Sequence, residues 1–223
     1  MIAFLKSLLE TEMRERPPFE AMILFVSTPD PNPVPVVSSA PVRDGYHARF
    51  SAKDRNTGAL LTADLNGGGA GNLLTDITKL DPLKHNWQQL LRAVRDRQAA
   101  EKLWLIGSKE ANGTGSHLHL DTAAALLRPY VNGTIEKSPI APSFEDFNGL
   151  VEAIRALLTT DLKDTPRNRI VLDVTGGQKV TSIAGAALTM NNELRFQYVQ
   201  TNPPFGTRVY DLSPHHPPHL HPD

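Results

Sequence analysis

The chain lacks cysteine altogether, which excludes disulfides, thiolate zinc sites and cysteine nucleophiles. Acidic and basic residues nearly balance, 24 against 23, so the formal net charge of -1 provides no overall attraction for long nucleic acid. The sequence has no stretch of about 18 apolar residues and no secretory signal at its N-terminus. We therefore expect a cytoplasmic protein in which any phosphate binding is confined to a local site; the alternative is a protein at the cytoplasmic face of the membrane, with the apolar residues 1–9 as the end of a truncated membrane helix.

Several chemical motifs are also missing. No GxxxxGK[ST] loop is present, so we expect no ATP held in a Walker loop. His117 and His119 stand two residues apart without a third ligand at metal-binding spacing, and we interpret them as an exposed loop pair. The glycine cluster at residues 66–72 does not complete a GxGxxG spacing, and we interpret it as a loop without a strand before it. We predict neither a metal nor a cofactor.

The patterning predicts one α/β domain. Its 223 residues suffice for a single buried core with insertions. Short apolar runs alternate with segments whose apolar residues repeat at helical spacing. The expected strands lie at residues 21–26, 46–50, 102–106, 134–140, 170–174, 194–200 and 207–212, and the expected helices at 82–98, 121–130, 144–158 and 180–190. This alternation predicts a Rossmann-like, mainly parallel sheet with helices on both faces and a C-terminal hairpin.

The most informative segment, residues 169–190, has the pattern of a buried strand, a two-glycine turn and a helix. We call residues 175–179 the glycine turn; they are Thr175, Gly176, Gly177, Gln178 and Lys179. Glycines let the backbone approach a ligand closely, so successive N–H groups can converge on an anion at the positive end of the helix. Lys179 adds a full charge, and Asp173 is expected to accept hydrogen bonds from the turn amides. The alternative is that the glycines only connect strand and helix tightly.

Two further polar clusters directly follow predicted strands. Ser27 and Thr28 come after residues 21–26, and Ser108 and Lys109 follow the strand at 102–106. Because parallel strands end at the same edge of a doubly wound sheet, we expect both clusters to lie beside the glycine turn. Hydroxyls, amides and lysines suit phosphodiester and ribose oxygens. Each cluster could instead be a capping or solvated turn.

The sequence Asp173-Val-Thr-Gly-Gly-Gln-Lys179 with its small-residue helix, together with segments 196–201 and 208–211, resembles the C-terminal half of CARF domains. These are the CRISPR-associated Rossmann-fold sensors of cyclic oligoadenylates. The resemblance covers residues 169–212 closely and 21–212 loosely, and many members carry Thr where this chain has Gln178. It implies a homodimer whose two carboxyl edges meet across a two-fold axis, cyclic tetra-adenylate as the first choice of ligand, and a ligand-facing Ser108.

The resemblance places a CARF domain at residues 21–213, between an N-terminal amphipathic helix or stalk at 1–20 and a disordered tail at 214–223. One hypothesis is a receptor that signals through the N-terminal helix to an effector in trans or to a membrane segment. The alternative is a stand-alone, metal-independent ring nuclease. In that case the ribose 2′-hydroxyl attacks its own phosphate, Lys179 and the turn amides stabilise the developing charge, and Ser27 or Ser108 orients the hydroxyl. The apolar residues at 1–9 favour the receptor.

Overall fold

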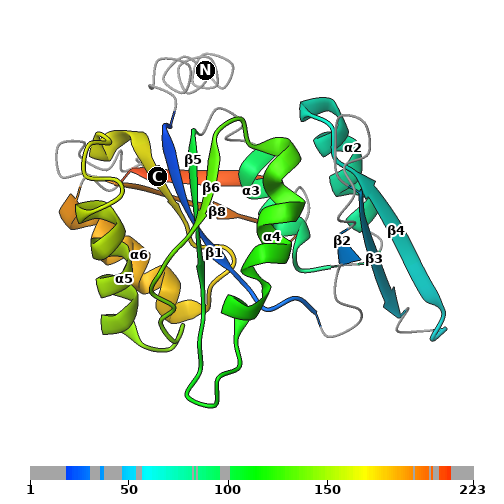
Figure 1. Ribbon diagram of the computed structural model, residues 1–223, viewed down its shortest axis with the longest axis horizontal. Helices are drawn as coiled ribbons and strands as arrows, with labels where there is room; N and C mark the ends of the chain where they lie inside the picture. The colour runs from blue at the N-terminus through cyan, green and yellow to red at the C-terminus, as the bar shows by residue number, and fades with distance from the viewer. Residues whose placement is uncertain are drawn as a thin grey trace, which may run out of the picture.

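The computed structural model describes residues 19–30, 36–37, 47–53, 57–81, 83, 85–95, 101–192, 194–200, 202 and 206–211. A six-stranded sheet with the order β6-β5-β1-β7-β8-β9 forms its centre (Figure 1). The strands are β1 (Ala21–Val26), β5 (Lys102–Gly107), β6 (Thr134–Lys137), β7 (Ile170–Asp173), β8 (Arg195–Val199) and β9 (Thr207–Asp211). All neighbouring pairs are parallel except β8 and β9, which form the expected antiparallel C-terminal hairpin.

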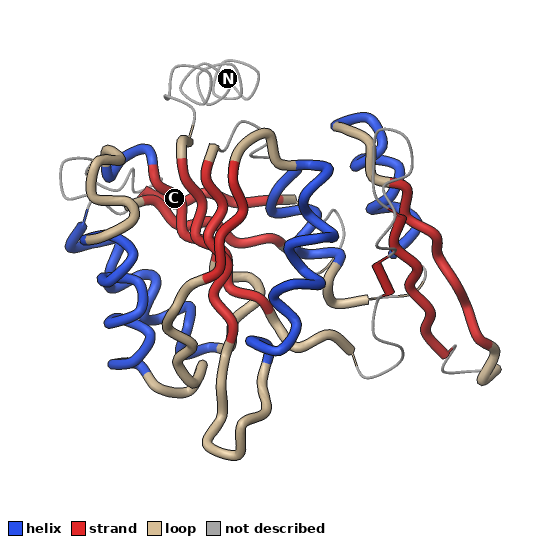
Figure 2. Tube along the Cα trace, in the orientation of Figure 1, coloured by secondary structure: helices blue, strands red, loops and turns tan. Residues whose placement is uncertain are grey.

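The order of these strands is that of a doubly wound fold. Numbered along the chain among themselves, the six strands are arranged 3-2-1-4-5-6, the Rossmann order. Helices cover both faces (Figure 2). One face carries α5 (Phe147–Thr159) and α6 (Lys179–Asn192), and the other carries α3 (Gln88–Arg95) and α4 (Leu120–Leu127). The predicted Rossmann-like α/β class is therefore confirmed.

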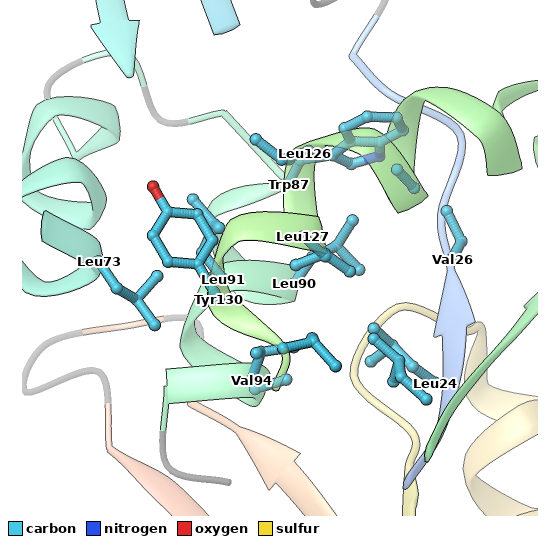
Figure 3. Close-up of a cluster of buried hydrophobic side chains, with 14 of the residues drawn as sticks. Leu24, Val26, Leu73, Trp87, Leu90, Leu91, Val94, Leu126, Leu127 and Tyr130 are labelled. Atoms are coloured by element: carbon cyan, nitrogen blue, oxygen red, sulfur yellow. The ribbon is translucent and has the colours of Figure 1, made fainter. Parts of the chain in front are cut away.

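Strand β1 lies at the centre of the core and is buried along its whole length. Its apolar run has no polar face because successive side chains point to opposite sides of the sheet, and both sides are covered. The side chains toward α5 and α6 are Ala21, Ile23 and Phe25, and those toward α3 and α4 are Met22, Leu24 and Val26. Figure 3 shows Leu24 and Val26 beside the cluster around Trp87, Leu90 and Leu127.

An inserted unit occupies the connection between β1 and α3. It consists of an antiparallel sheet, β2 (Val36–Val37), β3 (His47–Lys53) and β4 (Leu60–Asn66), followed by α2 (Ala70–Leu80). The strand expected at residues 46–50 is confirmed by β3. The interpretation of residues 66–72 as a loop without a preceding strand was wrong, because β4 ends at Asn66 and α2 begins at Ala70. Strand β4 exposes one side, so its alternating sequence gave only a weak signal.

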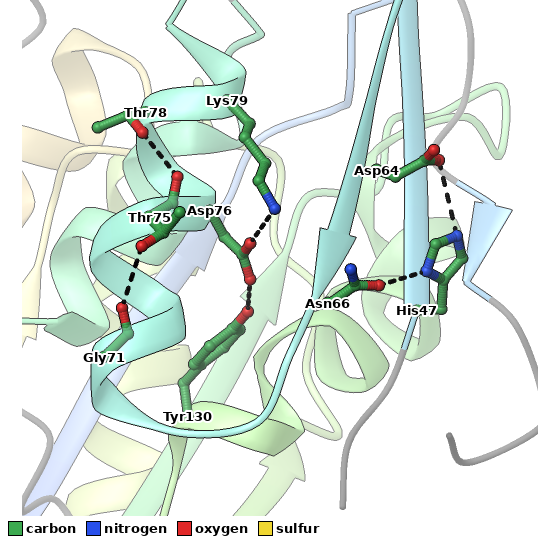
Figure 4. A network of polar contacts seen from close by, with 9 residues as sticks. All are labelled: His47, Asp64, Asn66, Gly71, Thr75, Asp76, Thr78, Lys79 and Tyr130. Carbon is green, nitrogen blue, oxygen red and sulfur yellow. Dashed lines mark hydrogen bonds and ion pairs between the residues drawn. The ribbon is translucent and has the colours of Figure 1, made fainter. Parts of the chain in front are cut away.

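A buried hydrogen bond joins the inserted unit to the main domain (Figure 4). The Tyr130 hydroxyl, just beyond α4, donates to Asp76 Oδ2 of α2 at 2.6 Å, and Lys79 Nζ pairs with Asp76 Oδ1 at 3.0 Å. Burial, and then the hydrogen bond to Asp76 and its charge, raise the pKa of Tyr130, which keeps this hydroxyl a donor. Gly67 packs closely here, since a Cβ would lie 2.6 Å from Cγ of Pro129.

Two helices begin later than their sequences predict. The helix expected from residue 82 begins at Gln88, because Asp81 ends α2 in helical geometry and its carboxylate binds Arg92. The helix expected from residue 144 begins at Phe147, because Asp146 is its N-cap and accepts from the Asn148 amide at 3.1 Å. Phe144 instead packs edge-on against Phe25.

The expected N-terminal helix at residues 1–20 and the tail at 214–223 lie outside the described residues, apart from residues 19 and 20. Within the part of the chain that the structure describes, no helix combines the length and apolarity that a bilayer crossing requires.

Candidate functional site

The three polar clusters leave the sheet at one edge, which we call the carboxyl edge. Val26 pairs in register with Gly107, and Leu24 pairs with Asp173, so β1, β5 and β7 all end there. Strands β1 and β7 are neighbours at the position where the strand order reverses. Open α/β sheets bind their ligands outside this switch point. The expectation that Ser27, Ser108 and the glycine turn share one edge is therefore confirmed.

The glycine turn lies directly against the end of β1. A Cβ on Gly176 would lie 1.9 Å from the carbonyl oxygen of Phe25 and 3.3 Å from the Ser27 amide nitrogen. A Cβ on Gly177 would lie 2.4 Å from the Thr181 side chain. Both positions therefore require glycine for close approach, which supports the tight-turn interpretation of the motif and also places the turn at the switch point.

The first part of the turn is fixed by buried hydrogen bonds. Asp173 is fully buried and its Oδ1 accepts from the Thr175 amide at 3.0 Å, as the sequence predicted. Its Oδ2 accepts from Gln197 Nε2 of β8 at 2.8 Å. The Thr175 hydroxyl accepts from the Val199 amide at 2.8 Å. Thr175 is thus anchored to β8, the next strand of the sheet, and its hydroxyl oxygen is already used in a hydrogen bond within the protein.

The second part of the turn offers donors. Thr181 Oγ1 accepts from the Gln178 amide at 3.2 Å and so caps α6, whose first turn leaves amides without intrahelical acceptors. No hydrogen bond within the described residues uses the Gly177 amide. Gln178 and Lys179 are exposed. The exposed Lys179 ammonium therefore lies at the start of a 14-residue helix, where the helix dipole and the first amides favour an anion.

The segment after β1 is held by Asn86, which lies just before α3. Asn86 Nδ2 donates to the Thr28 carbonyl at 2.7 Å and to Ser27 Oγ at 3.3 Å. Asn86 also exchanges hydrogen bonds with Asp30 through its amide and its side-chain oxygen. Ser27 is half-buried and Thr28 exposed. The Ser27 hydroxyl hydrogen remains able to donate, because the Asn86 contact uses the oxygen as acceptor.

The segment after β5 forms a loop whose two ends are bonded together, which we call the β5 loop (residues 107–117). Ser108 is buried, and its Oγ lies 3.2 Å from Ser116 Oγ and accepts from the Ser116 amide at 3.2 Å. Its amide donates to Ser116 Oγ at 2.8 Å. A Cβ on Gly115 would lie 2.3 Å from the Ser108 carbonyl oxygen. Ser108 therefore bridges the ends of its own loop, whereas Lys109 is exposed.

The histidines of this region do not form a metal site in the structure. His117 Nδ1 lies 2.8 Å from the Ser108 carbonyl oxygen, so it belongs to the same loop closure. The pKa of His119 is lowered, first by burial and then by the charge of His117. Within the described residues, no group of three or more His, Asp or Glu side chains is placed to hold a metal ion.

Sequence reasoning missed several residues that shape this edge. Asn86 lies inside a predicted helix, nothing in the sequence distinguishes Ser116 from other loop serines, and Thr181 is one of many small residues of α6. Gln197 carried a usable signal, because Arg195, Gln197 and Val199 alternate as the buried side of β8. A neutral polar residue on the buried side of a strand predicts a hydrogen-bonded role.

Comparisons with known proteins assign no activity. No protein-family model matches the chain. The chain is similar to an uncharacterized protein of Aquifex aeolicus (strain VF5), with 28% identity over 145 residues, which covers 62% of this chain and 45% of that protein. The chain therefore spans less than half the length of that curated relative.

Proposed function

We propose that the protein binds a cyclic oligoadenylate at the glycine turn and acts as a sensor in type III CRISPR antiviral defence, with cyclic tetra-adenylate as the first ligand to test. The observation that carries the proposal is the turn itself, in which the Gly177 amide, the first amides of α6 and Lys179 are presented at the switch point. Phosphodiester oxygens are the acceptors that such donors bind. The resemblance of residues 173–179 to CARF domains supports this class of anion.

The proposal includes a homodimer. Ile183 and Met190 of α6 are 61% and 57% exposed, and a spacing of seven residues places them on one side of the helix. A two-fold contact would cover the same apolar side on both copies. We propose a two-fold axis parallel to α6, because α6 begins at Lys179 and only that direction brings both glycine turns to the same end of the shared surface. A second copy of the chain is therefore the partner that we propose for α6.

The burial of Ser108 favours the receptor over the ring nuclease, because it removes one of the two serines proposed to orient the ribose hydroxyl. A serine that orients a ribose 2′-hydroxyl must present its own hydroxyl to the ligand. The Ser108 hydroxyl is buried and faces Ser116, which leaves Ser27 as the more accessible of the two serines proposed for this role. The signal of such a receptor would pass to an effector in trans or a membrane segment through the N-terminal residues, which lie outside the described part of the chain.

The test incubates the protein with labelled cyclic tetra-adenylate in EDTA and follows both retention and conversion to linear product. We expect retention without turnover over hours. Conversion that is lost in Lys179→Ala would establish the ring nuclease instead. Absence of binding to cyclic adenylate rings of any size, by a protein with a cooperative unfolding transition, would contradict the proposed function.

The dimer is tested separately by light scattering coupled to gel filtration. We expect a dimer for the unmodified chain and a monomer for the double variant Ile183→Asp and Met190→Asp, because each charge would be buried in the two-fold contact. The matched control is Leu118→Asp, which alters an equally exposed apolar side chain on the β5 side of the molecule and should leave the dimer intact.

A further inference from the structure

A buried amide side chain lies behind the glycine turn. Gln197 is fully buried in β8, and its Nε2 donates to two acceptors, Asp173 Oδ2 at 2.8 Å and the Ala93 carbonyl at 3.2 Å. An amide in this position costs free energy unless its hydrogens are bonded, so the side chain has a defined orientation. One amide hydrogen is directed to Asp173, at the end of β7, and the other to Ala93 of α3.

The contact with Asp173 reaches the turn in one step. Asp173 Oδ2 accepts from Gln197 Nε2, and Asp173 Oδ1 accepts from the Thr175 amide. Because the carboxylate is planar and rigid, the position of Gln197 Nε2 influences where Oδ1 meets the Thr175 amide. The backbone carbonyl of Gln197 also accepts from the Val174 amide at 3.1 Å. Gln197 of β8 therefore holds Val174 through its backbone and Asp173 through its side chain, the two residues that precede the glycine turn.

The contact with Ala93 ties this arrangement to the same segment that holds the end of β1. Ala93 lies in α3, and Asn86, two residues before that helix, bonds to Ser27 and Thr28. Both sides of the switch point are thus linked by hydrogen bonds to this segment, one side through Asn86 and the other through Ala93. A shift of the Gln197 amide would move the turn relative to β1, where Gly176 has no spare distance to the Phe25 carbonyl.

We propose that Gln197 is a positioning residue for anion binding: it touches no ligand, but by orienting Asp173 against α3 it fixes the turn so that its amides converge. This proposal rests on the function proposed above. A merely structural role would lower global stability alone, whereas a positioning role loosens the turn within a folded protein and weakens binding there.

The experiment uses the full chain with Gln197→Met, which keeps the length and volume of the side chain but removes both donors. The matched control is Gln88→Met, the same exchange at a buried glutamine of α3 whose Oε1 has no partner among the described residues. Hydrogen exchange is followed in the peptide spanning residues 174–180 without ligand. We expect about tenfold faster exchange, and about tenfold weaker binding of labelled cyclic tetra-adenylate, in Gln197→Met only.

A second variant covers the case in which Gln197→Met fails to fold. Gln197→Glu places an acceptor against the Asp173 carboxylate, and two such groups share a proton more readily at lower pH. We expect its excess exchange in residues 174–180 to diminish on acidification, a response that a purely structural defect would not give.

The outcomes separate the two proposals. If the unmodified chain binds no cyclic adenylate but Gln197→Met accelerates exchange in the turn, the proposed function fails and the positioning role stands. If the unmodified chain binds and Gln197→Met leaves both exchange and affinity unchanged, the positioning role is overturned. Equal acceleration by Gln88→Met would also overturn it.

Discussion

The glycine turn and the β5 loop begin alike and end differently. Each follows a buried parallel strand and carries glycine, a hydroxyl residue and lysine. In the β5 loop the hydroxyl of Ser108 is bonded to Ser116, and eight residues separate Gly107 from the 3₁₀ turn η1 (Ser116–His119). In the glycine turn, α6 begins two residues after Gly177. The β5 loop uses its serine hydroxyls to join its own ends, and its Lys109 amide and Glu110 carboxylate bond residues 142 and 143. The glycine turn enters a helix at once and leaves amides that can bind a ligand.

The largest effect is expected from a substitution that disrupts the glycine turn. Gly176→Ala would force a Cβ to within 1.9 Å of the Phe25 carbonyl, a contact with backbone that cannot move aside, so we expect at least about 3 kcal/mol of destabilisation. Gly113→Ala in the β5 loop has a φ of +80 and no atom near the added carbon, so it should cost only about 1 kcal/mol. Urea unfolding measures both, and equal losses would contradict this difference in packing.

The second prediction compares the two lysines. Both are exposed, but Lys179 belongs to the start of α6, whereas Lys109 belongs to the β5 loop. We expect Lys179→Ala to weaken binding of cyclic tetra-adenylate by about 2 kcal/mol through a lost charge-assisted contact, and Lys109→Ala by less than about 0.5 kcal/mol. Isothermal titration at fixed salt gives both values. A larger loss in Lys109→Ala would move the site to the β5 loop.

The third prediction compares the two hydroxyls. Ser108→Ala removes the acceptor of the Ser116 amide, and Thr175→Val removes the acceptor of the Val199 amide. Each leaves a polar group without its partner and should cost about 1 to 2 kcal/mol of unfolding free energy. Only Thr175→Val should change ligand affinity more than about twofold. A ligand-facing Ser108, as the family resemblance implies, would be recovered if Ser108→Ala weakened binding strongly.

The smallest expected effect is a pH dependence of the β5 side. The pKa of His119 is lowered from its usual value of 6.5, so the folded state binds fewer protons than the unfolded chain. The contribution is present above about pH 6.5 and is lost as the pH falls below it. Hydrogen exchange in residues 108–119 should therefore accelerate between about pH 7.5 and 5.5, after correction for intrinsic rates.

Residues 174–180 contain no histidine and provide the internal reference. His119→Gln should remove most of the difference between the two peptides. If the pH response of the β5 side persisted in this variant, another group would be responsible.

Much of the architecture could be predicted because it follows from local patterns. The continuous apolar run at residues 21–26 indicated a strand buried on both faces, and the helical spacing after Gly177 indicated α6. The helix starts were less predictable. Asp81-Pro82 has the composition of an N-cap and a first helical residue, yet Asp81 ends α2, because the preceding helix and Arg92 determine its geometry.

Local sequence patterns were enough to predict the α/β class, the strand-turn-helix at residues 170–192 and the polar residues that end the strands, since each depends on neighbours a few residues apart. Which of those polar groups stay available depends on contacts between distant parts of the fold. Asn86 lies 59 residues from Ser27, and Gln197 lies 24 residues from Asp173, so the sequence around either residue does not identify its partner. A hydrogen bond between distant segments forms only when the fold has brought them together. These bonds therefore decide which hydroxyls are used within the fold and which amides stay available for a ligand.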